Sequence, residues 1–171
     1  LNGKSCASSM GFSALDGLMM GTRSGNLDAG VLLYLMEQGW DHKRIQTLLY
    51  KQSGLLGVSG ISADMRTLRA SGSPQAQRAI ELFTYRVQRE AGSMAEGLWA
   101  ELDPQGLDVL AFSGGIGEHD AVLREQVCAR LHWLGLALDP QANASATGDA
   151  MTAIHAPDSQ LEVWVVPTAE G

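Results

Sequence analysis

The chain has 171 residues, of which 45% are hydrophobic and 18% are charged, a composition ordinary for one globular domain with a core of its own. The formal net charge of −7 argues against a nucleic-acid-binding protein that relies on phosphate neutralisation. No apolar run approaches the roughly 18 residues of a membrane-spanning helix, so none is predicted. Cys6 and Cys128 lack metal-site spacing, which indicates reduced thiols and a cytoplasmic protein.

The first half of the sequence predicts helices separated by glycine-rich loops. Residues 1–26 predict a strand remnant and loops, with one short helical turn over 14–20. Asp28 and Asp41 are expected to cap helices that reach about Gln38 and Lys51. The apolar stripes of these helices are Val31, Leu32, Leu35 and Met36 on the first, and Ile45, Leu48 and Leu49 on the second. A glycine-punctuated loop is expected over 53–60, and then a short helix that Ser62 caps.

A long helix is predicted next, because Ser73 supplies a capping hydroxyl and Pro74 suits the first turn. It is expected to reach about Glu101. Its buried side consists of Ala76, Ile80, Phe83, Val87, Met94 and Leu98. Gly92 and Gly97 either weaken this helix or mark close packing against a neighbour.

The remaining sequence predicts strands mixed with one further helix. A buried strand over 107–112 ends in a glycine turn, and a helix follows over 121–134. The inward residues of that helix are Val122, Val127, Leu131 and Leu134. A surface loop is expected over 139–150, followed by strands over 152–156 and 161–167. The pattern predicts an α/β fold. The chain begins without methionine and ends directly after a strand, so we expect a piece of a longer protein.

The glycine turn, SGGIGEH over 113–119, is the first candidate site. Glycines let the backbone approach a ligand closely, and the N–H groups at the start of a following helix attract anions. The sequence lacks the spacing of a Walker loop or a dinucleotide fingerprint, so a tight structural turn is an equal alternative. His119 differs from the other three histidines because it is expected at a helix N-terminus, where a neutral imidazole can contact a ligand.

Three further segments carry polar groups suited to a nucleotide. Arg23 lies between Gly21 and Gly25, and its guanidinium suits phosphate or carboxylate, with a surface arginine as the alternative. Asp64 and Arg66 fall near a helix start, where they either contact a nucleotide or cap the helix. Glu170 follows a strand end, a common place for a magnesium ligand, with a frayed acidic terminus as the alternative.

Taken together and in order, four segments resemble the acetate and propionate kinase family. They are SMGFSALDGLMMGTRSG over 9–25, GVSGISADMR over 57–66, FSGGIGE over 112–118 and VVPTAE over 165–170. The resemblance covers essentially the whole chain, and it is to the C-terminal domain of the family. The family's N-terminal domain is therefore expected to lie outside these 171 residues.

The resemblance implies a fold, a reaction and partners. The fold is a ribonuclease-H-like domain of the acetate-and-sugar-kinase and actin superfamily, with a mixed sheet and helices on both faces. The reaction is reversible phosphoryl transfer from ATP to acetate, which gives ADP and acetyl phosphate and requires magnesium or manganese. Family members are homodimers that pair through this domain, and the long helix after Pro74 is a candidate contributor, although intradomain packing explains its apolar face equally well.

The resemblance also assigns roles to residues. Arg23 corresponds to the arginine that steadies the phosphoryl group in flight. Asp64, Met65 and Arg66 correspond to a segment that contacts the nucleotide, Gly115, Ile116, Gly117, Glu118 and His119 to the loop that holds its adenosine, and Glu170 to a magnesium-linked glutamate. The family usually has asparagine where this chain has His119. Two other functions stay open: a propionate or butyrate kinase, and a nucleotide-binding or dimerisation module without catalysis.

Overall fold

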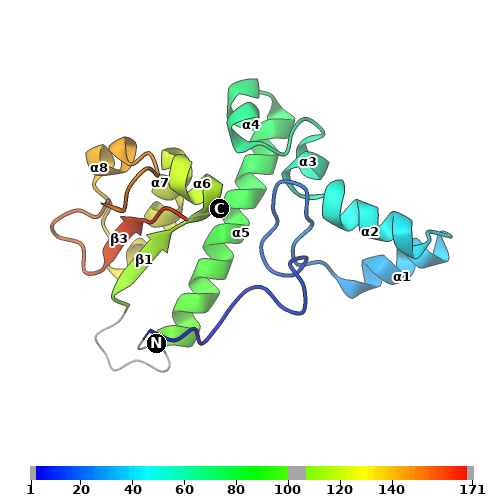
Figure 1. Ribbon diagram of the computed structural model, residues 1–171, viewed down its shortest axis with the longest axis horizontal. Helices are drawn as coiled ribbons and strands as arrows, with labels where there is room; N and C mark the ends of the chain where they lie inside the picture. Colours follow the sequence, from blue (N-terminus) through cyan, green and yellow to red (C-terminus); the bar gives the residue numbers. More distant parts are fainter. Residues whose placement is uncertain (1–2, 100–106, 169–171) are drawn as a thin grey trace. The chain divides into compact units, whose positions relative to one another are not determined.

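The computed structural model describes residues 3–99 and 107–168 (Figure 1). The chain forms two compact units, Leu1–Glu90 and Ala91–Gly171. The first unit is built from helices and loops, and the second contains a small mixed sheet with helices. None of the described helices is both long enough and apolar enough to cross a membrane.

Helices α1 to α5 begin in the first unit. Their bounds are α1 Ala29–Glu37, α2 His42–Lys51, α3 Gly54–Ser59, α4 Met65–Ser71 and α5 Pro74–Trp99. The carboxylates of Asp28 and Asp41 accept hydrogen bonds of 2.7 Å from the backbone N–H groups of Gly30 and Arg44. These bonds satisfy donors that a helix start leaves unpaired, and the two predicted caps are confirmed.

Helix α5 begins where the Ser-Pro signal predicts it, and the Ser73 hydroxyl accepts a hydrogen bond from the Ala76 N–H. The helix runs without a break to Trp99, and the expected end at Glu101 lies outside the described residues. No described heavy atom lies within 4 Å of a Cβ added at Gly92 or Gly97. Close packing against the described residues of this chain is therefore not the reason for these glycines.

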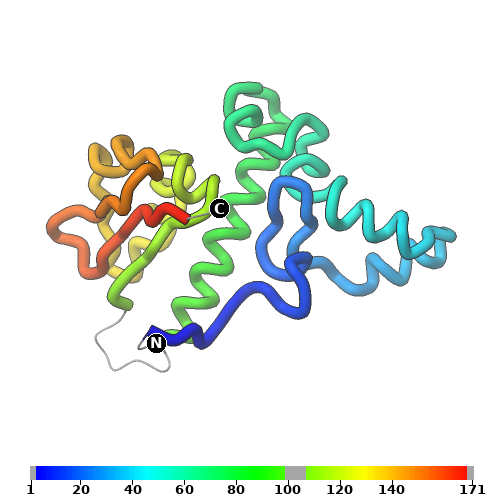
Figure 2. Tube along the Cα trace, viewed as in Figure 1, coloured from blue at the N-terminus to red at the C-terminus, as the bar shows by residue number. Residues whose placement is uncertain are grey.

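Two local expectations in the first unit are wrong. Residues 14–20 contain no helix, and Figure 2 shows residues 3–28 as a tube without helical turns. Gly17 has φ +84°, a left-handed conformation that interrupts a right-handed turn. Conversely, the loop expected over 53–60 is helix α3. Two N–H groups of its first turn donate to the backbone carbonyls of Met20 and Gly21. Gly60, at φ +65°, ends the helix.

The apolar stripe predicted on α1 is not buried. No residue of α1 is buried, and Val31 and Met36 are 40% and 56% exposed. Helix α2 behaves as predicted, because Ile45 and Leu49 are buried. Periodicity thus identified both helices, but it did not show which of them packs inward.

The second unit contains a three-stranded sheet in the described residues, ordered β1-β3-β2. Its elements are β1 Val109–Phe112, α6 Gly114–His119, α7 Ala121–Arg130, η1 His132–Leu134, α8 Pro140–Ser145, β2 Thr152–Ala153 and β3 Glu162–Val165. Strand β3 is parallel to β1, with Phe112 opposite Val165, and antiparallel to β2. Val163 and Val165 of this central strand are fully buried.

Four expectations in this unit are corrected. Strand β1 is not buried along its length, since Val109 is 51% exposed on the edge of the sheet. The glycine turn after it is the short helix α6. The helix expected over 121–134 ends at Arg130 and continues as η1, and its expected inward residue Val122 is 46% exposed. The loop expected over 139–150 contains α8, because Asp139 caps it and Pro140 suits its first turn.

Candidate functional site

The loop that carries Arg23 is fixed by the backbone of the α2–α3 junction. The carbonyls of Met20 and Gly21 accept hydrogen bonds of 2.9 Å from two first-turn donors of α3, the N–H groups of Leu55 and Leu56. The Thr22 carbonyl accepts from the Ser53 N–H at 2.9 Å, and the Ser24 N–H donates to the Leu49 carbonyl at 3.0 Å. The backbone on both sides of Arg23 is therefore held in place.

Gly54 is required where this loop meets α3. Its φ is +63°, and a Cβ added there would fall on the Met20 carbonyl oxygen and 2.8 Å from the Arg23 carbonyl oxygen. An L-residue at this position carries both backbone strain and a steric clash. The close approach of α3 to the Arg23 loop thus depends on the absence of a side chain at residue 54.

The Arg23 side chain is half-buried and has no carboxylate partner among the described residues. One Nη atom lies 3.6 Å from the Met20 sulfur, and the guanidinium carbon lies 5.9 Å from the centre of the Tyr50 ring. A guanidinium whose charge is not offset by an acid is suited to bind phosphoryl oxygens.

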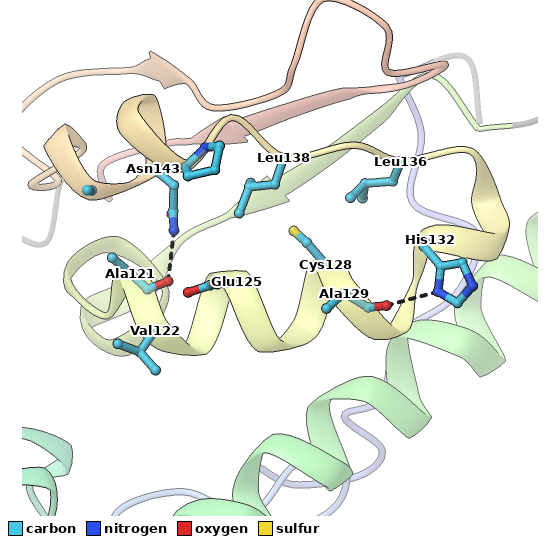
Figure 3. Close-up of a pocket in the computed structure, with 11 residues that line it drawn as sticks. Ala121, Val122, Glu125, Cys128, Ala129, His132, Leu136, Leu138 and Asn143 are labelled. Carbon is cyan, nitrogen blue, oxygen red and sulfur yellow. Dashed lines mark hydrogen bonds between the residues drawn. The ribbon is translucent and has the colours of Figure 1, made fainter.

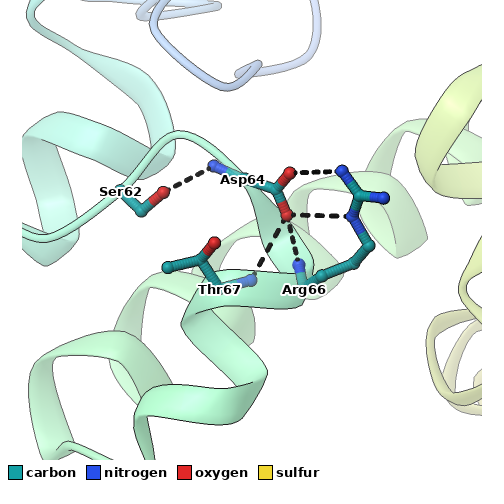
Figure 4. A network of polar contacts seen from close by, with 4 residues as sticks. All are labelled: Ser62, Asp64, Arg66 and Thr67. Atoms are coloured by element: carbon teal, nitrogen blue, oxygen red, sulfur yellow. Dashed lines mark hydrogen bonds and ion pairs between the residues drawn. The ribbon is translucent and has the colours of Figure 1, made fainter.

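Asp64 caps α4 and pairs with Arg66 (Figure 4). Its Oδ1 accepts hydrogen bonds from the Arg66 and Thr67 N–H groups at 2.8 and 3.3 Å, and the Arg66 guanidinium donates to Oδ2 at 2.7 Å. The Arg66 side chain and the Thr67 N–H lower the pKa of Asp64 to about 2. Ser62, the expected cap, instead accepts a hydrogen bond from the Asp64 N–H at 3.1 Å, one step before the helix.

The segment before Asp64 lies against the Arg23 loop. A Cβ added at Gly21 would lie 2.9 Å from the Ala63 carbonyl oxygen. The first unit therefore brings together the two segments that the sequence singled out, residues 21–25 and 62–66. Of the three predicted nucleotide contacts here, Arg66 has a side chain that is 88% exposed, whereas Met65 is buried at 5% exposure.

In the second unit, Glu118 ties the glycine-rich helix α6 to the chain after β3. Its Oε1 accepts hydrogen bonds from the Gly114 N–H at 2.7 Å, the Thr168 N–H at 3.0 Å and the Thr168 hydroxyl at 2.8 Å. The Thr168 hydroxyl and N–H hold the pKa of Glu118 below its usual range, so the group is ionised at neutral pH. Glu118 as a whole residue is buried, with only 6% of its surface exposed.

This contact changes the expectation for the glycine-rich segment. The sequence predicts N–H groups that attract an anion, but the Gly114 N–H donates to the chain's own Glu118. A carboxylate at that point repels a phosphate group. The segment is therefore better suited to an uncharged part of a ligand than to a phosphate.

Arg124 is a buried residue that the analysis of the sequence missed. It is fully buried on α7 and uses all five of its N–H donors. Its acceptors, at 2.7–2.9 Å, are the carbonyls of Gly117 and Glu118 at the end of α6, both the side-chain and the backbone oxygen of Asn143, and the Ala146 carbonyl. A signal was present, because Arg124 shares the inward spacing of Val127 and Leu131 on the predicted helix.

His119 is the last residue of α6, and it lies one position before Asp120, the cap of α7, which is the helix predicted from residue 121. Its Nδ1 lies 2.6 Å from the Thr147 carbonyl oxygen. Because a carbonyl only accepts, this nitrogen carries a proton and donates to it. His119 therefore lies beside the N-terminus of α7, as expected, and one of its two ring nitrogens is committed to the chain.

The pocket drawn in Figure 3 lies outside the predicted site. It has a volume of about 370 Å³ between α7 and residues 136–144 and is lined by Val122, Cys128 and Leu138 among others. Burial raises the pKa of the Cys128 thiol to about 12, so the thiol stays protonated and is a poor nucleophile. Gly115 to His119 do not line this pocket.

The predicted magnesium residue, Glu170, lies outside the described residues. Within the described ranges 3–99 and 107–168, no group of three His, Cys, Asp or Glu residues is arranged to hold a metal ion. Magnesium in kinases needs only one or two carboxylates, because substrate phosphates and water supply the other ligands. Glu170, which follows β3 in the sequence, is therefore sufficient as a single protein carboxylate for such a magnesium ion.

Comparison with known proteins identifies the family. The model of the Acetokinase family matches residues 1–171. The acetate kinase of Rhodopseudomonas palustris is 55% identical over 168 residues, which are 98% of this chain and 40% of that protein, and that of Rickettsia akari is 47% identical over 170 residues. The chain thus spans about 40% of the length of the curated relatives that it matches.

Solved structures agree on the fold. Acetate kinase from Porphyromonas gingivalis matches with a TM-score of 0.85 at 39% identity, over 95% of this chain and 40% of that one. A propionate kinase from Francisella tularensis matches with a TM-score of 0.80 at 38% identity, over 95% of this chain and 40% of that one. The chain has the acetate-kinase type of α/β fold, and it belongs to the Acetokinase family.

Proposed function

We propose that this chain is the C-terminal nucleotide-binding domain of a cytoplasmic acetate kinase. The full-length protein, the complete product of the gene that encodes the chain, would transfer a phosphoryl group from ATP to acetate, giving ADP and acetyl phosphate. The observation that carries the proposal is Arg23, whose guanidinium is held on a fixed loop and has no carboxylate partner in the described residues. The family match over the whole chain supports it.

In this proposal, Arg23 binds the phosphoryl group as it transfers. Negative charge on its equatorial oxygens is what an enzyme must stabilise, and a preoriented guanidinium does so without reorganising. The fixed loop that carries Arg23 also helps to keep its guanidinium N–H groups aligned with the phosphoryl oxygens. Magnesium or manganese, when bound, would offset charge on the nucleotide phosphates, and Glu170 is the residue proposed to hold it.

Two segments of the chain are proposed as nucleotide contacts. In the first unit the exposed Arg66 side chain, together with Asp64 and the Met65 backbone, forms one contact segment. In the second unit, the segment from Gly115 to His119 would hold the adenosine. That assignment is supported by the Glu118 carboxylate beside the Gly114 N–H, which disfavours phosphate there but tolerates a nucleoside.

The test is acetate-dependent and ATP-dependent hydroxamate formation by the full-length protein. Arg23→Ala is expected to lower kcat about a thousandfold, because an arginine acting on a transferring phosphoryl group has an effect of that order. Arg44→Ala, an exposed arginine of the same unit, is the matched control and is expected to keep wild-type kcat. Absence of turnover by the wild-type protein would overturn the proposal.

A second candidate is a propionate or butyrate kinase, which the similarity to the Francisella tularensis propionate kinase favours. Comparing kcat/KM of the full-length protein for acetate, propionate and butyrate decides between an acetate kinase and this second candidate. A preference for acetate eliminates this candidate.

A third candidate is a nucleotide-binding or dimerisation module without catalysis. It is motivated by His119, which replaces the family's usual asparagine and whose Nδ1 bonds to the Thr147 carbonyl. Calorimetry with MgADP on the full-length protein separates the two classes: binding without phosphoryl transfer favours the module, and transfer rules it out.

We also propose that the full-length protein is a homodimer that pairs through this domain, as the resemblance implies. Helix α5 is the candidate contributor. Sedimentation at micromolar concentration tests this, and a monomer would contradict it.

A further inference from the structure

The guanidinium of Arg23 is contacted by two uncharged side chains. The Met20 sulfur lies 3.6 Å from one of its nitrogens, and the centre of the Tyr50 ring lies 5.9 Å from its central carbon. We propose that Tyr50 is a positioning residue, whose ring orients Arg23 toward the transferring phosphoryl group. This inference rests on the proposed function, because it takes Arg23 as the residue that binds that group.

Tyr50 and Arg23 sit on backbone segments that are fixed to each other. Tyr50 is the penultimate residue of α2, which Asp41 caps and Leu49 anchors in the core. The Thr22 hydroxyl, next to Arg23, donates to the Tyr50 carbonyl at 2.8 Å. The Ser24 N–H, on the other side of Arg23, donates to the Leu49 carbonyl. These bonds therefore hold the backbone of Tyr50 beside the backbone of the residues that flank Arg23.

An aromatic ring orients an arginine in a way that a carboxylate cannot. A carboxylate would accept the guanidinium N–H groups and offset the charge that the phosphoryl oxygens need. A ring attracts the cation through its electron-rich face and accepts no strong N–H hydrogen bond. The Tyr50 contact thus restricts the side chain while its charge and N–H donors stay available, which is the condition for preorganised catalysis.

The same helix supplies a matched control. At the other end of α2, the Arg44 guanidinium lies 3.5 Å from the centre of the Trp40 ring. Arg44 is exposed, and neither residue belongs to the segments that carry the proposed site. Trp40 directly precedes the Asp41 cap of α2, so replacing it removes a shorter aromatic–arginine contact at the start of this helix without touching Arg23.

The experiment measures kcat and KM for MgATP in the full-length protein. Tyr50→Leu, which removes the ring but keeps an apolar side chain, is expected to lower kcat about fivefold with little change in KM. Tyr50→Phe keeps the ring and is expected to restore wild-type kcat. Trp40→Leu is expected to leave kcat unchanged. If Tyr50→Leu does not fold, Tyr50→Met tests the same loss of the ring.

A double-mutant cycle shows whether Tyr50 acts through Arg23. In the Arg23→Ala background, Tyr50→Leu is expected to have no further effect on kcat, because the group that it orients is absent. The NMR resonance of the Arg23 Nε–H group reports the contact without any need for turnover. It is expected to move in Tyr50→Leu and to keep its position in Tyr50→Phe.

The outcomes separate this inference from the proposed function. An active wild-type enzyme with an unchanged kcat in Tyr50→Leu overturns the role of Tyr50 alone. The same holds if Tyr50→Phe loses as much kcat as Tyr50→Leu, or if the loss persists undiminished in Arg23→Ala. A wild-type enzyme without turnover overturns the proposed function instead, and a resonance that does not move overturns the contact itself.

Discussion

At the scale of single residues, the Asp64 carboxylate both caps a helix and holds an arginine side chain. Its Oδ1 caps α4, and its Oδ2 holds the Arg66 guanidinium. The capping alternative is therefore confirmed, and the same bonds present Arg66 at the surface, where the proposed nucleotide contact would need it. The cap was predictable from the residue types, because an aspartate before a helix start has one dominant use.

The Asp64 cap predicts a pH-dependent contribution to stability. Its pKa is lowered from 3.8 to about 2, so the stabilisation is complete above the unfolded value and is lost as the pH falls toward the folded one. Asp64→Ala is expected to lower the thermal unfolding midpoint by roughly 2–4 °C at neutral pH. The difference in unfolding midpoint between wild type and Asp64→Ala should become smaller below about pH 4. Thermal melts of both proteins across this range measure it.

Arg66→Ala supplies the control for this prediction. It removes the hydrogen bond that does most to lower the pKa of Asp64, so in the Arg66→Ala background Asp64→Ala should lower the unfolding midpoint by less, and the loss of this difference should be complete at a higher pH. A difference between wild type and Asp64→Ala that stayed constant down to about pH 3 would contradict the assignment.

At the scale of elements, α3 is decided by its neighbours and not by its own sequence. Its six residues contain two glycines, which favour a loop, and the sequence predicted one there. The carbonyls of Met20 and Gly21 supply partners for its first donors, and these carbonyls lie about 35 residues earlier in the chain. A pattern within residues 53–60 cannot contain that information.

Gly54→Ala is expected to damage the Arg23 loop as well as the helix. The added Cβ would meet the carbonyl oxygens of Met20 and Arg23, so the loop must shift. We expect a loss of about 1–3 kcal/mol in the free energy of unfolding and at least a tenfold loss of kcat, measured by denaturant unfolding and the hydroxamate assay.

Gly60→Ala is the matched variant at the other end of α3. Its φ of +65° carries similar strain, but no heavy atom of the described residues lies within 4 Å of an added Cβ. It should therefore lose stability and keep kcat. An equal loss of kcat in both variants would show that the clash with the Arg23 loop has no part in the effect.

Arg124 connects α6, α7 and α8 in the second unit. Arg124→Met is expected to lower the free energy of unfolding by about 3–5 kcal/mol, since it removes the donors to five oxygen acceptors, four of which form buried hydrogen bonds. Arg130→Met, an exposed position on the same helix, should change it by less than about 0.5 kcal/mol. Denaturant unfolding of the two variants measures the difference, and equal stabilities would refute the role of Arg124.

At the scale of the whole molecule, the residues proposed to contact the nucleotide come from two different parts of the chain. Arg23 and Arg66 belong to the first unit, and the segment from Gly115 to His119 belongs to the second. The relatives are about two and a half times as long as this chain, since it spans 40% of them. The acyl-binding residues are proposed to lie in the remainder.

We therefore expect the isolated 171 residues to form no acetate-dependent hydroxamate under conditions in which the full-length protein turns over. The physical reason is that phosphoryl transfer needs both reactants held in line, and this chain is proposed to supply only the nucleotide side. The assay on equal molar amounts of both proteins is the measurement. Clear turnover by the isolated chain would refute the prediction.

The sequence by itself determined the family, the α/β class, the starts of α1, α2 and α5, and the residues proposed to contact a nucleotide. These depend on short-range signals, such as caps, a proline in a first turn, and motifs of consecutive residues. Only the tertiary structure decided that Gly114–His119 is a helix whose Gly114 N–H is taken by Glu118, that Arg124 is a fully bonded buried cation, and that Tyr50 faces Arg23. These features depend on contacts that a local pattern does not encode: Glu118 meets Thr168 50 residues later, Arg124 meets Asn143 19 residues later, and α2 folds back onto the Arg23 loop.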